Sequence, residues 1–226
     1  GAGGTIAPGT TTLLGGGSQD FNIVPNAGYI VQDVKVDALT GGGSVGGLNF
    51  YSFINVTANH TLEATFDPGW KQPTGFANNT NWGNPTGAYT SNNAYADSFN
   101  FLGNAASIDY NGFGVTIPAG STIDGIEVAV EGQTPGLTLS ISVSPDGTNF
   151  PPPRTLAFTA NDSTVRSGSP TDKWGFSWPL STFTNFTVRV GAPPPGLFGA
   201  GFTVDQVQVK VHFTAPALTV TINQAA

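Results

Sequence analysis

Apolar and polar residues alternate along most of this chain with a period of two residues. The clearest run extends from Leu137 to Val143, where the intervening polar residues are Thr138, Ser140 and Ser142. Successive side chains of a β-strand point to opposite faces of a sheet, so this pattern predicts a strand with one buried face. No stretch sustains the 3.6-residue period of an amphipathic helix. The sequence therefore predicts an all-β protein with less than about 5 % helix, far below the usual third.

The same alternation recurs on both sides of this run. The segment Asp67-Pro68-Gly69 interrupts it, because proline and glycine together end a strand and begin a turn. Strands that are apolar on one face must pack that face against another sheet. We therefore predict a small antiparallel β repeat domain at 1–67 and a larger, jelly-roll-like β-sandwich at 68–214. The other predicted strands have their apolar positions at Phe21 and Ile23; Ile30, Val34 and Val36; Leu62, Ala64 and Phe66; Phe113, Val115 and Ile117; Ile126, Val128 and Val130; Phe186, Val188 and Val190; and Val207, Val209, Val211 and Phe213.

Residues 215–226 follow as a predicted linker and extension strand. Leu218, Val220 and Ile222 form an apolar face, and polar residues lie between them. A strand without a partner cannot satisfy its backbone amides or bury that face. We predict that it contacts a neighbouring subunit by β-strand addition. The alternative is that it is the first strand of a further repeat.

Three segments of the first domain carry a family resemblance: 3–8 (GGTIAP), 21–29 (FNIVPNAGY) and 51–66 (YSFINVTANHTLEATF). Together they span Gly3 to Phe66, which resembles the small all-β bacterial repeat related to the internalin B-repeats. Such units space, display or join other parts of secreted and cell-surface proteins. The resemblance implies an extracellular or cell-surface location.

The second domain shows a further resemblance at 113–128 (FGVTIPAGSTIDGIEV), 174–175 (WG) and 204–211 (VDQVQVKV). These segments resemble a β-sandwich domain of bacterial surface proteins and phage structural proteins. The motifs are structural and imply no functional residues. The segment 218–226 also resembles the first strand of a further immunoglobulin-like repeat.

Composition narrows the function classes. Charged residues make up 9 % of the chain, the formal net charge is −7, and the seven basic residues are scattered. Nucleic-acid binding needs a basic stripe along the phosphates, so that class is excluded. Cysteine is absent, which excludes thiol catalysis and disulfides. No apolar run reaches the roughly 18 residues that span a bilayer, so we expect no membrane insertion.

The sequence offers no convincing catalytic pair. His60 is predicted to hydrogen-bond a turn, and His212 falls on a polar, solvent-exposed strand position. Glu127 and Glu131 could form the two carboxylates of a glycosidase, but four residues of strand place them about 13 Å apart. A solvated outer face is the favoured interpretation of both glutamates. We therefore predict that the protein is not an enzyme.

Two further patterns involve aspartates. The segment Ser144–Phe150 (SPDGTNF) is similar to an Asp-box, a hairpin turn in which Asp146 caps backbone amides, so it is interpreted as structural. A calcium ion needs six to eight oxygen ligands, and no compact calcium loop is present. No cofactor or catalytic metal is predicted, and a structural calcium ion stays open. The candidate oxygen donors are Asp97, Asp109, Asp124 and Asp205.

Aromatic residues in an Asn/Gly-rich loop are the candidate binding site. Trp82, Tyr89 and Tyr95 could form a platform on which a polysaccharide stacks. The alternative, which we favour, is that the aromatics fill the ends of the sandwich, since large rings dominate core burial. Asn-x-Ser/Thr sequons provide candidate glycosylation sites. They occur at Asn55, Asn59, Asn78, Asn161 and Asn185.

The leading hypothesis from the sequence is a non-catalytic structural subunit of an extracellular or cell-surface assembly. A filament, a surface layer or a modular adhesin would each fit, joined by self-association through the terminal strand into a homopolymer. The first alternative is a carbohydrate-binding accessory module that uses the Trp/Tyr loop. The second is a structural protein of a phage virion.

Overall fold

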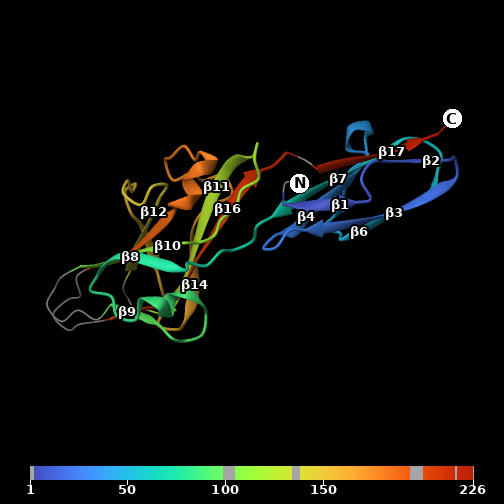
Figure 1. Cartoon of the computed structure of the whole chain (residues 1–226). Coiled ribbons are helices and arrows are strands. Elements are labelled where there is room, and N and C mark those ends of the chain that lie inside the picture. Colours follow the sequence, from blue (N-terminus) through green and yellow to red (C-terminus); the bar gives the residue numbers. More distant parts are fainter. Residues whose placement is uncertain (1–2, 99–104, 134–137, 194–200, 217, 226) are drawn as a thin grey trace. The chain divides into compact units, whose positions relative to one another are not determined.

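The computed structural model describes residues 3–98, 105–133, 138–193, 201–216 and 218–225 (Figure 1). Within these ranges the chain is built from β-strands and three short 3-10 turns, and no α-helix occurs. The all-β fold class is therefore confirmed. No helix in this part of the chain is long and apolar enough to cross a membrane. Leu137, Ala217 and Ala226, which belong to predicted strands or segments, lie outside the described ranges.

The strands gather into two compact units, which are described separately. The first unit contains residues 1–69, 117–122 and 213–226. One of its sheets has the order β1-β3-β6, and the other, here called the terminal-strand sheet, has the order β2-β17-β7-β4-β5. The strands of this unit are β1 (Gly4–Ala7), β2 (Thr11–Leu13), β3 (Gly17–Pro25), β4 (Ile30–Val36), β5 (Ser44–Gly46), β6 (Phe50–Val56), β7 (His60–Asp67) and β17 (Leu218–Gln224).

The core of the first unit follows the alternation in the sequence. Phe21 and Ile23 of β3 are 0 % and 1 % exposed, whereas Asn22 between them is exposed. Residues from β1, β4, β6, β7 and β17 complete the same cluster. Its other members are Ile6, Val34, Phe53, Val56, Leu62, Ala64, Phe66, Val220 and Ile222.

His60 fixes the turn that precedes β5. Its Nδ1 lies 2.7 Å from the carboxylate of Asp37, and the other oxygen of that carboxylate accepts a hydrogen bond of 2.8 Å from the backbone N–H of Thr61. Asp37 has a φ of 52°, a left-handed conformation that an aspartate adopts more readily than most residues. The ring of Phe53 stacks on the imidazole. The prediction that His60 hydrogen-bonds a turn is therefore confirmed.

The terminal strand differs from its prediction. β17 lies inside the terminal-strand sheet, antiparallel to β7 and parallel to β2 (Figure 1). Val220 and Ile222 are 6 % and 1 % exposed, and Leu218 packs against the same core. The expectation of a strand without a partner in its own chain is wrong, because local sequence does not show that β7, some 150 residues earlier, has a free edge.

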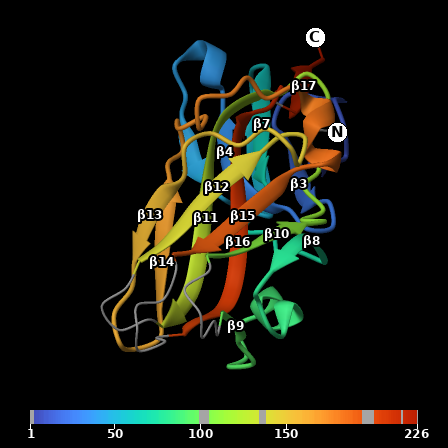
Figure 2. The ribbon, with the colours of Figure 1, turned by 90° about the vertical axis from the view of Figure 1, so that its left-hand side faces the viewer.

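The second unit contains residues 70–116 and 123–212, so β11 and β16 each extend slightly beyond it. Two sheets form a β-sandwich, with the orders β13-β12-β15-β10-β8 and β14-β11-β16-β9 (Figure 2). We call the first of these the groove sheet. The strands are β8 (Gly75–Thr80), β9 (Ala96–Ser98), β10 (Ala106–Asn111), β11 (Thr122–Gln133), β12 (Thr138–Ser144), β13 (Arg154–Ala157), β14 (Ser163–Gly168), β15 (Thr187–Ala192) and β16 (Phe202–Thr214).

One predicted strand is absent. Phe113, Val115 and Ile117 lie in irregular chain between β10 and β11. Gly112 and Gly114 have φ values of 70° and 60°, and this left-handed backbone interrupts the extended conformation that a strand requires. Phe113 is nevertheless buried, so the apolar pattern there reports burial without a strand.

Replacing Ile222 by alanine should lower the free energy of unfolding of the first unit by about 2–5 kcal/mol, the usual cost of emptying a buried aliphatic site. The exposed neighbour Asn223, changed to alanine, serves as the control and should stay within about 0.5 kcal/mol of the parent. Urea unfolding measures both variants. Equal stability of Ile222→Ala and the parent would show that β17 does not belong to this core.

Candidate functional site

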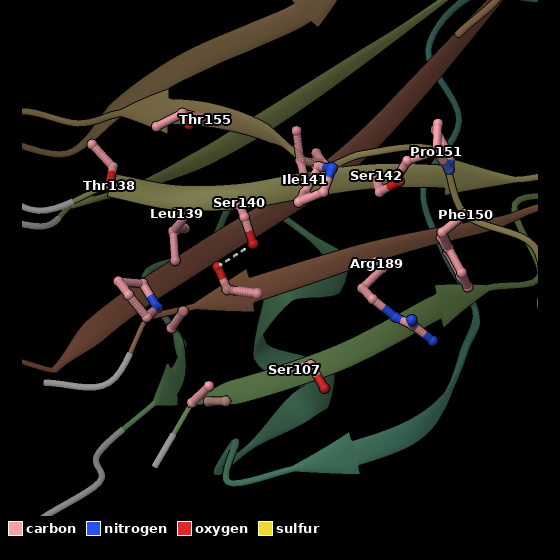
Figure 3. A pocket seen from close by; sticks show the side chains of 16 residues that line it. Ser107, Thr138, Leu139, Ser140, Ile141, Ser142, Phe150, Pro151, Thr155 and Arg189 are labelled. Atoms are coloured by element: carbon pink, nitrogen blue, oxygen red, sulfur yellow. Dashed lines mark hydrogen bonds between the residues drawn. The ribbon is translucent and has the colours of Figure 1, made fainter. Parts of the chain in front are cut away.

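A groove of about 460 Å³ lies on the outer face of the groove sheet (Figure 3). Its lining includes Thr138, Ser140 and Ser142 of β12, and also Leu139 and Ile141 of the same strand, which are 1 % and 0 % exposed. Figure 3 shows Phe150 and Pro151 at one end of the groove and Thr138 at the other. The volume falls within the usual range for small-molecule sites, about 300–1,000 Å³.

Strand register places hydroxyl groups in a row across the floor of the groove. Ser140 of β12 lies opposite Thr155 of β13 on one side and Gly191 of β15 on the other, and Gly191 in turn lies opposite Ser107 of β10. A Cβ atom on Gly191 would approach the Ser140 Oγ to 2.5 Å. Glycine therefore leaves the space that the Ser140 hydroxyl occupies.

A second row contains an ion pair between the buried Asp109 and the partly exposed Arg189. Ser142 lies opposite Arg189, and Arg189 lies opposite Asp109. The guanidinium donates to both carboxylate oxygens, at 2.6 Å from Nε and 2.7 Å from one terminal nitrogen. Asp109 is 1 % exposed and also accepts a hydrogen bond of 2.8 Å from the side-chain amide of Asn78. The hydrogen bonds to Asp109 raise the pKa of Arg189, which favours the charged guanidinium. The positive charge of Arg189 and the negative charge of Asp109 then cancel within the pair.

Phe150 covers the guanidinium at the end of the groove. The central carbon of Arg189 lies 3.8 Å from the ring centroid of Phe150, a cation–π contact. The preceding hairpin turn holds this ring in place. Asp146 accepts hydrogen bonds of 2.8 Å each from the backbone N–H groups of Thr148 and Asn149. These bonds hold the pKa of Asp146 well below its usual range and confirm the structural interpretation of the Asp-box-like segment.

The hydroxyl groups of the floor differ in how accessible they are to a ligand: Ser142 is 3 % exposed, Ser107 and Ser140 are partly exposed, and Thr138 and Thr155 are exposed. Ser140 donates to the carbonyl of Gly191 at 3.2 Å, and Ser142 donates to the carbonyl of Pro151 at 3.0 Å. A hydroxyl that donates still has lone pairs that can accept. The groove therefore presents several acceptors and donors beside apolar groups, which suits a ligand rich in hydroxyls.

The aromatic platform predicted from the sequence is not assembled around Trp82. That residue is 5 % exposed, so its face is covered and its predicted role in stacking a sugar is wrong. Tyr89 meets Tyr110 edge to face, with ring centroids 6.3 Å apart, and burial raises the pKa of Tyr89. Tyr95 donates a hydrogen bond of 2.9 Å to Asp162. Both tyrosines are partly exposed, and their glycan-binding role stays a prediction.

Two of the other tryptophans also lie in the core, whereas Trp70 is partly exposed. Trp174 and Trp178 are 2 % and 7 % exposed, and their indole N–H groups donate to the carbonyls of Ile126 and Lys173 at 2.9 Å and 2.8 Å. Arg154 lies over the ring of Trp174, 3.7 Å from its centroid. Burial of large rings was the favoured interpretation of the aromatic candidates. Trp82 agrees with it, and Trp174 and Trp178 are buried in the same way.

The aspartates proposed for calcium are not brought together as a set. Asp109 is committed to Arg189, and Asp97 forms an isolated backbone bridge with Gly83. Among the described residues, a different set, Glu131, Asp162 and Asp205, places its carboxylate oxygens within 4.8 Å of one another. Three carboxylates can contribute to a cation site, although calcium takes six to eight oxygens. The search of the sequence for a compact calcium loop did not reveal this set, because its three residues come from separate segments of the chain.

The catalytic candidates occupy structural positions. The Nε2 of His212 lies 3.0 Å from a carboxylate oxygen of Glu127. The side chain of His212 is 21 % exposed, so the prediction of a solvent-exposed histidine is wrong. Glu131 belongs to the carboxylate cluster instead. All five sequon asparagines are exposed, and two are engaged: Asn59 accepts from the Gln224 N–H at 2.8 Å, and Asn78 donates to Asp109.

Acid should destabilise the turn that carries Phe150. The pKa of Asp146 is lowered in the folded state, so its stabilising effect is present above the ordinary pKa of about 4 and is lost as pH falls below it. We expect Asp146→Asn to be less stable than the parent at neutral pH. Its melting temperature should also fall less steeply between about pH 5 and pH 2. Calorimetry at several pH values measures both slopes, and identical slopes would contradict this role of Asp146.

Comparisons with known proteins do not identify a family for this chain. No family model matches the chain, and no curated protein matches it. One similar solved structure comes from work on the promiscuous specificity of carbohydrate-binding modules of the β-sandwich superfamily. It is 10 % identical, and the match covers 95 % of this chain and 97 % of that one at a TM-score of 0.28. At that score the likeness carries no argument about function.

Proposed function

We propose that this chain is a non-catalytic carbohydrate-binding module of an extracellular or cell-surface protein, and that the groove binds a neutral polysaccharide. The observation that carries the proposal is the cross-strand row of Thr155, Ser140, Gly191 and Ser107. Four adjacent strands supply this row, so its hydroxyl groups are held by the sheet itself. Sites on rigid elements are more precise than sites on loops.

The chemistry of the lining fits a sugar. A pyranose presents hydroxyl groups at its edge and C–H groups on its faces. The groove offers hydroxyl groups along its floor and apolar surface from Phe150 and Pro151 at one end, and Pro153 also belongs to its lining. Ligand sites of this kind combine an apolar wall with a few polar groups that fix orientation.

The balance of charge favours a neutral ligand. Arg189 is the one charged side chain in the described lining, and Asp109 offsets it. The net charge of −7 disfavours an anionic glycan further, because like charges repel at a distance. Uronic-acid polymers should therefore bind less tightly than neutral ones.

Binding without hydrolysis follows from the same lining. Glycoside hydrolysis requires an acid and a base on either side of the scissile bond. No carboxylate or histidine side chain belongs to the described lining of the groove. The polysaccharide is thus expected to be retained unchanged.

The structural-subunit hypothesis is the second candidate function. The observation that favours it is the position of β17, a strand that follows the second unit in sequence and lies inside a sheet of the first unit. An adhesin or filament subunit could use both properties, holding a glycan with one unit and joining its neighbours with the other. The remaining hypothesis, a structural protein of a phage virion, is supported by no feature of the described groove.

Affinity electrophoresis tests the groove. Neutral probes (dextran, galactomannan and mixed-linkage β-glucan) are compared with the acidic probes alginate and polygalacturonate, and at least one neutral probe should retard the protein. Phe150→Ala should weaken that binding by about 1–2 kcal/mol, roughly 5- to 30-fold, because the apolar wall is lost. Phe76→Ala removes an exposed ring from the same sheet outside the groove and should leave binding unchanged.

A blocking variant separates the groove from the rest of the sandwich. Thr155→Tyr adds a ring above the floor at an exposed edge-strand position and should abolish retardation. Thr164→Tyr makes the same change on the exposed edge strand of the opposite sheet and is the matched control. Binding that survives Thr155→Tyr but is lost in Tyr95→Ala would instead support the loop predicted from the sequence. Release of new reducing ends from any retained polysaccharide would contradict the non-catalytic proposal.

A further inference from the structure

The first unit is completed by a strand that comes after the whole β-sandwich in sequence. Strands β1 to β7 end at Asp67, and β17 begins at Leu218. β17 occupies the position between β7 and β2 in the terminal-strand sheet. We call this position the strand slot.

Both sides of the slot bind the strand. Register joins Leu218 through Ile222 to β7, and joins Ile222 through Gln224 to β2. Residues of the neighbouring loops and of β2 add further contacts to the backbone of this segment. The N–H of Thr221 donates to the Thr10 hydroxyl at 3.2 Å, that of Gln224 to the Asn59 side chain at 2.8 Å, and that of Ala225 to the Leu13 carbonyl at 2.8 Å.

The slot also provides apolar pockets for alternate side chains. Val220 and Ile222 enter the core, and Leu218 packs at its margin. Main-chain hydrogen bonds with pockets for every second residue are the two requirements of recognition by β-strand addition. In the sheet order, β17 is the neighbour that connects β2 to β7. A vacant slot would therefore expose the β7 edge and detach β2.

These contacts recognise the segment from Leu218 to Gln224 and do not depend on which molecule supplies it. Ala215 and Pro216 separate β17 from β16, and proline has no N–H with which to continue a strand ladder. We propose that the strand slot of one molecule accepts β17 of a second copy of this chain, so that copies join by strand exchange. Reciprocal exchange closes a dimer, and successive head-to-tail exchange gives an open chain.

Protein concentration decides whether β17 occupies the strand slot of its own chain or that of a second copy. In its own chain the strand is tethered, and tethering gives an effective concentration on the millimolar scale. Exchange is therefore expected when molecules refold together at high concentration, and it should be rare in a dilute folded sample. This inference does not depend on glycan binding, because the slot and the groove belong to different units.

Engineered cysteines test the exchange directly, because the natural chain has none. Glu63 and Thr219 lie opposite one another on β7 and β17. Opposed residues of antiparallel strands have Cα atoms about 4.5–5.5 Å apart, within the range that a disulfide spans. One chain carries Glu63→Cys and a size tag, and the other carries Thr219→Cys. The two are unfolded, mixed, refolded together at high and low concentration, and then oxidised.

Strand exchange predicts a covalent heterodimer on a non-reducing gel, with a mass of about twice the 23.2 kDa of the chain plus the mass of the tag. The amount of this heterodimer should increase with the protein concentration during refolding. The control pairs Glu63→Cys with Thr148→Cys, an exposed turn position of the second unit, and should give only collisional background. The double variant Glu63→Cys/Thr219→Cys, refolded when dilute, should form its disulfide within one chain. Formation of this disulfide would show that a chain carrying both cysteines folds and that the two cysteines can react with one another. Heterodimer no greater than the control at every concentration, with the internal disulfide intact, would overturn the proposal.

Discussion

The ion pair between Arg189 and Asp109 is the contact on which the proposed binding face depends. Asp109 is 1 % exposed, and an unpaired buried carboxylate is costly to keep charged. Arg189 and Asn78 together satisfy it, which ties β8, β10 and β15 into one sheet. The same guanidinium supports the ring of Phe150. A single buried charge thus requires the partner that shapes one end of the groove, and the pair leaves the groove without a net charge.

The first unit depends on a different constraint, the pairing of a strand that follows the whole second unit in sequence. Its core includes Val220 and Ile222 of β17. The other strands of the unit end at Asp67, about 150 residues before β17 begins. A long connection to a terminal strand makes the contact non-local, and non-local pairing is slow to form. The arrangement makes the stability of the N-terminal sheet a property of the whole chain. It also gives the unit a binding position specific for a short segment of the same protein.

Much of the fold could be predicted from the alternation of residues, and the candidate site could be predicted only in part. Thr138, Ser140 and Ser142 were assigned to a polar strand face, and they line the groove. Their neighbours Ser107, Thr155 and Gly191 were not recognised, because alternation within a strand does not reveal which strands lie side by side. The partner of β17 was missed for the same reason.

The aromatic residues were harder to assign from the sequence. Trp82 lies in an Asn/Gly-rich loop, and that composition left an exposed stacking platform open beside the favoured interpretation of burial. The loop instead folds back, and the side chain of Asn79 bonds both the N–H and the carbonyl of Trp82, at 3.1 Å and 2.9 Å. Whether the ring is buried depends on how such hydrogen bonds fold the loop, and the composition of the loop does not predict them. Phe150, by contrast, follows a recognised turn, and only the structure places it over Arg189.

The central claim is that a neutral glycan occupies the groove sheet, and NMR chemical-shift mapping tests it most directly. A panel of neutral hexasaccharides is titrated into labelled protein, and the backbone amide signals are followed. The account predicts that the shifted signals cluster at Ser107, Ser140, Phe150, Thr155 and Gly191. Shifts confined to the region of Tyr89 and Tyr95, or no shifts with any neutral glycan in the panel, would contradict it.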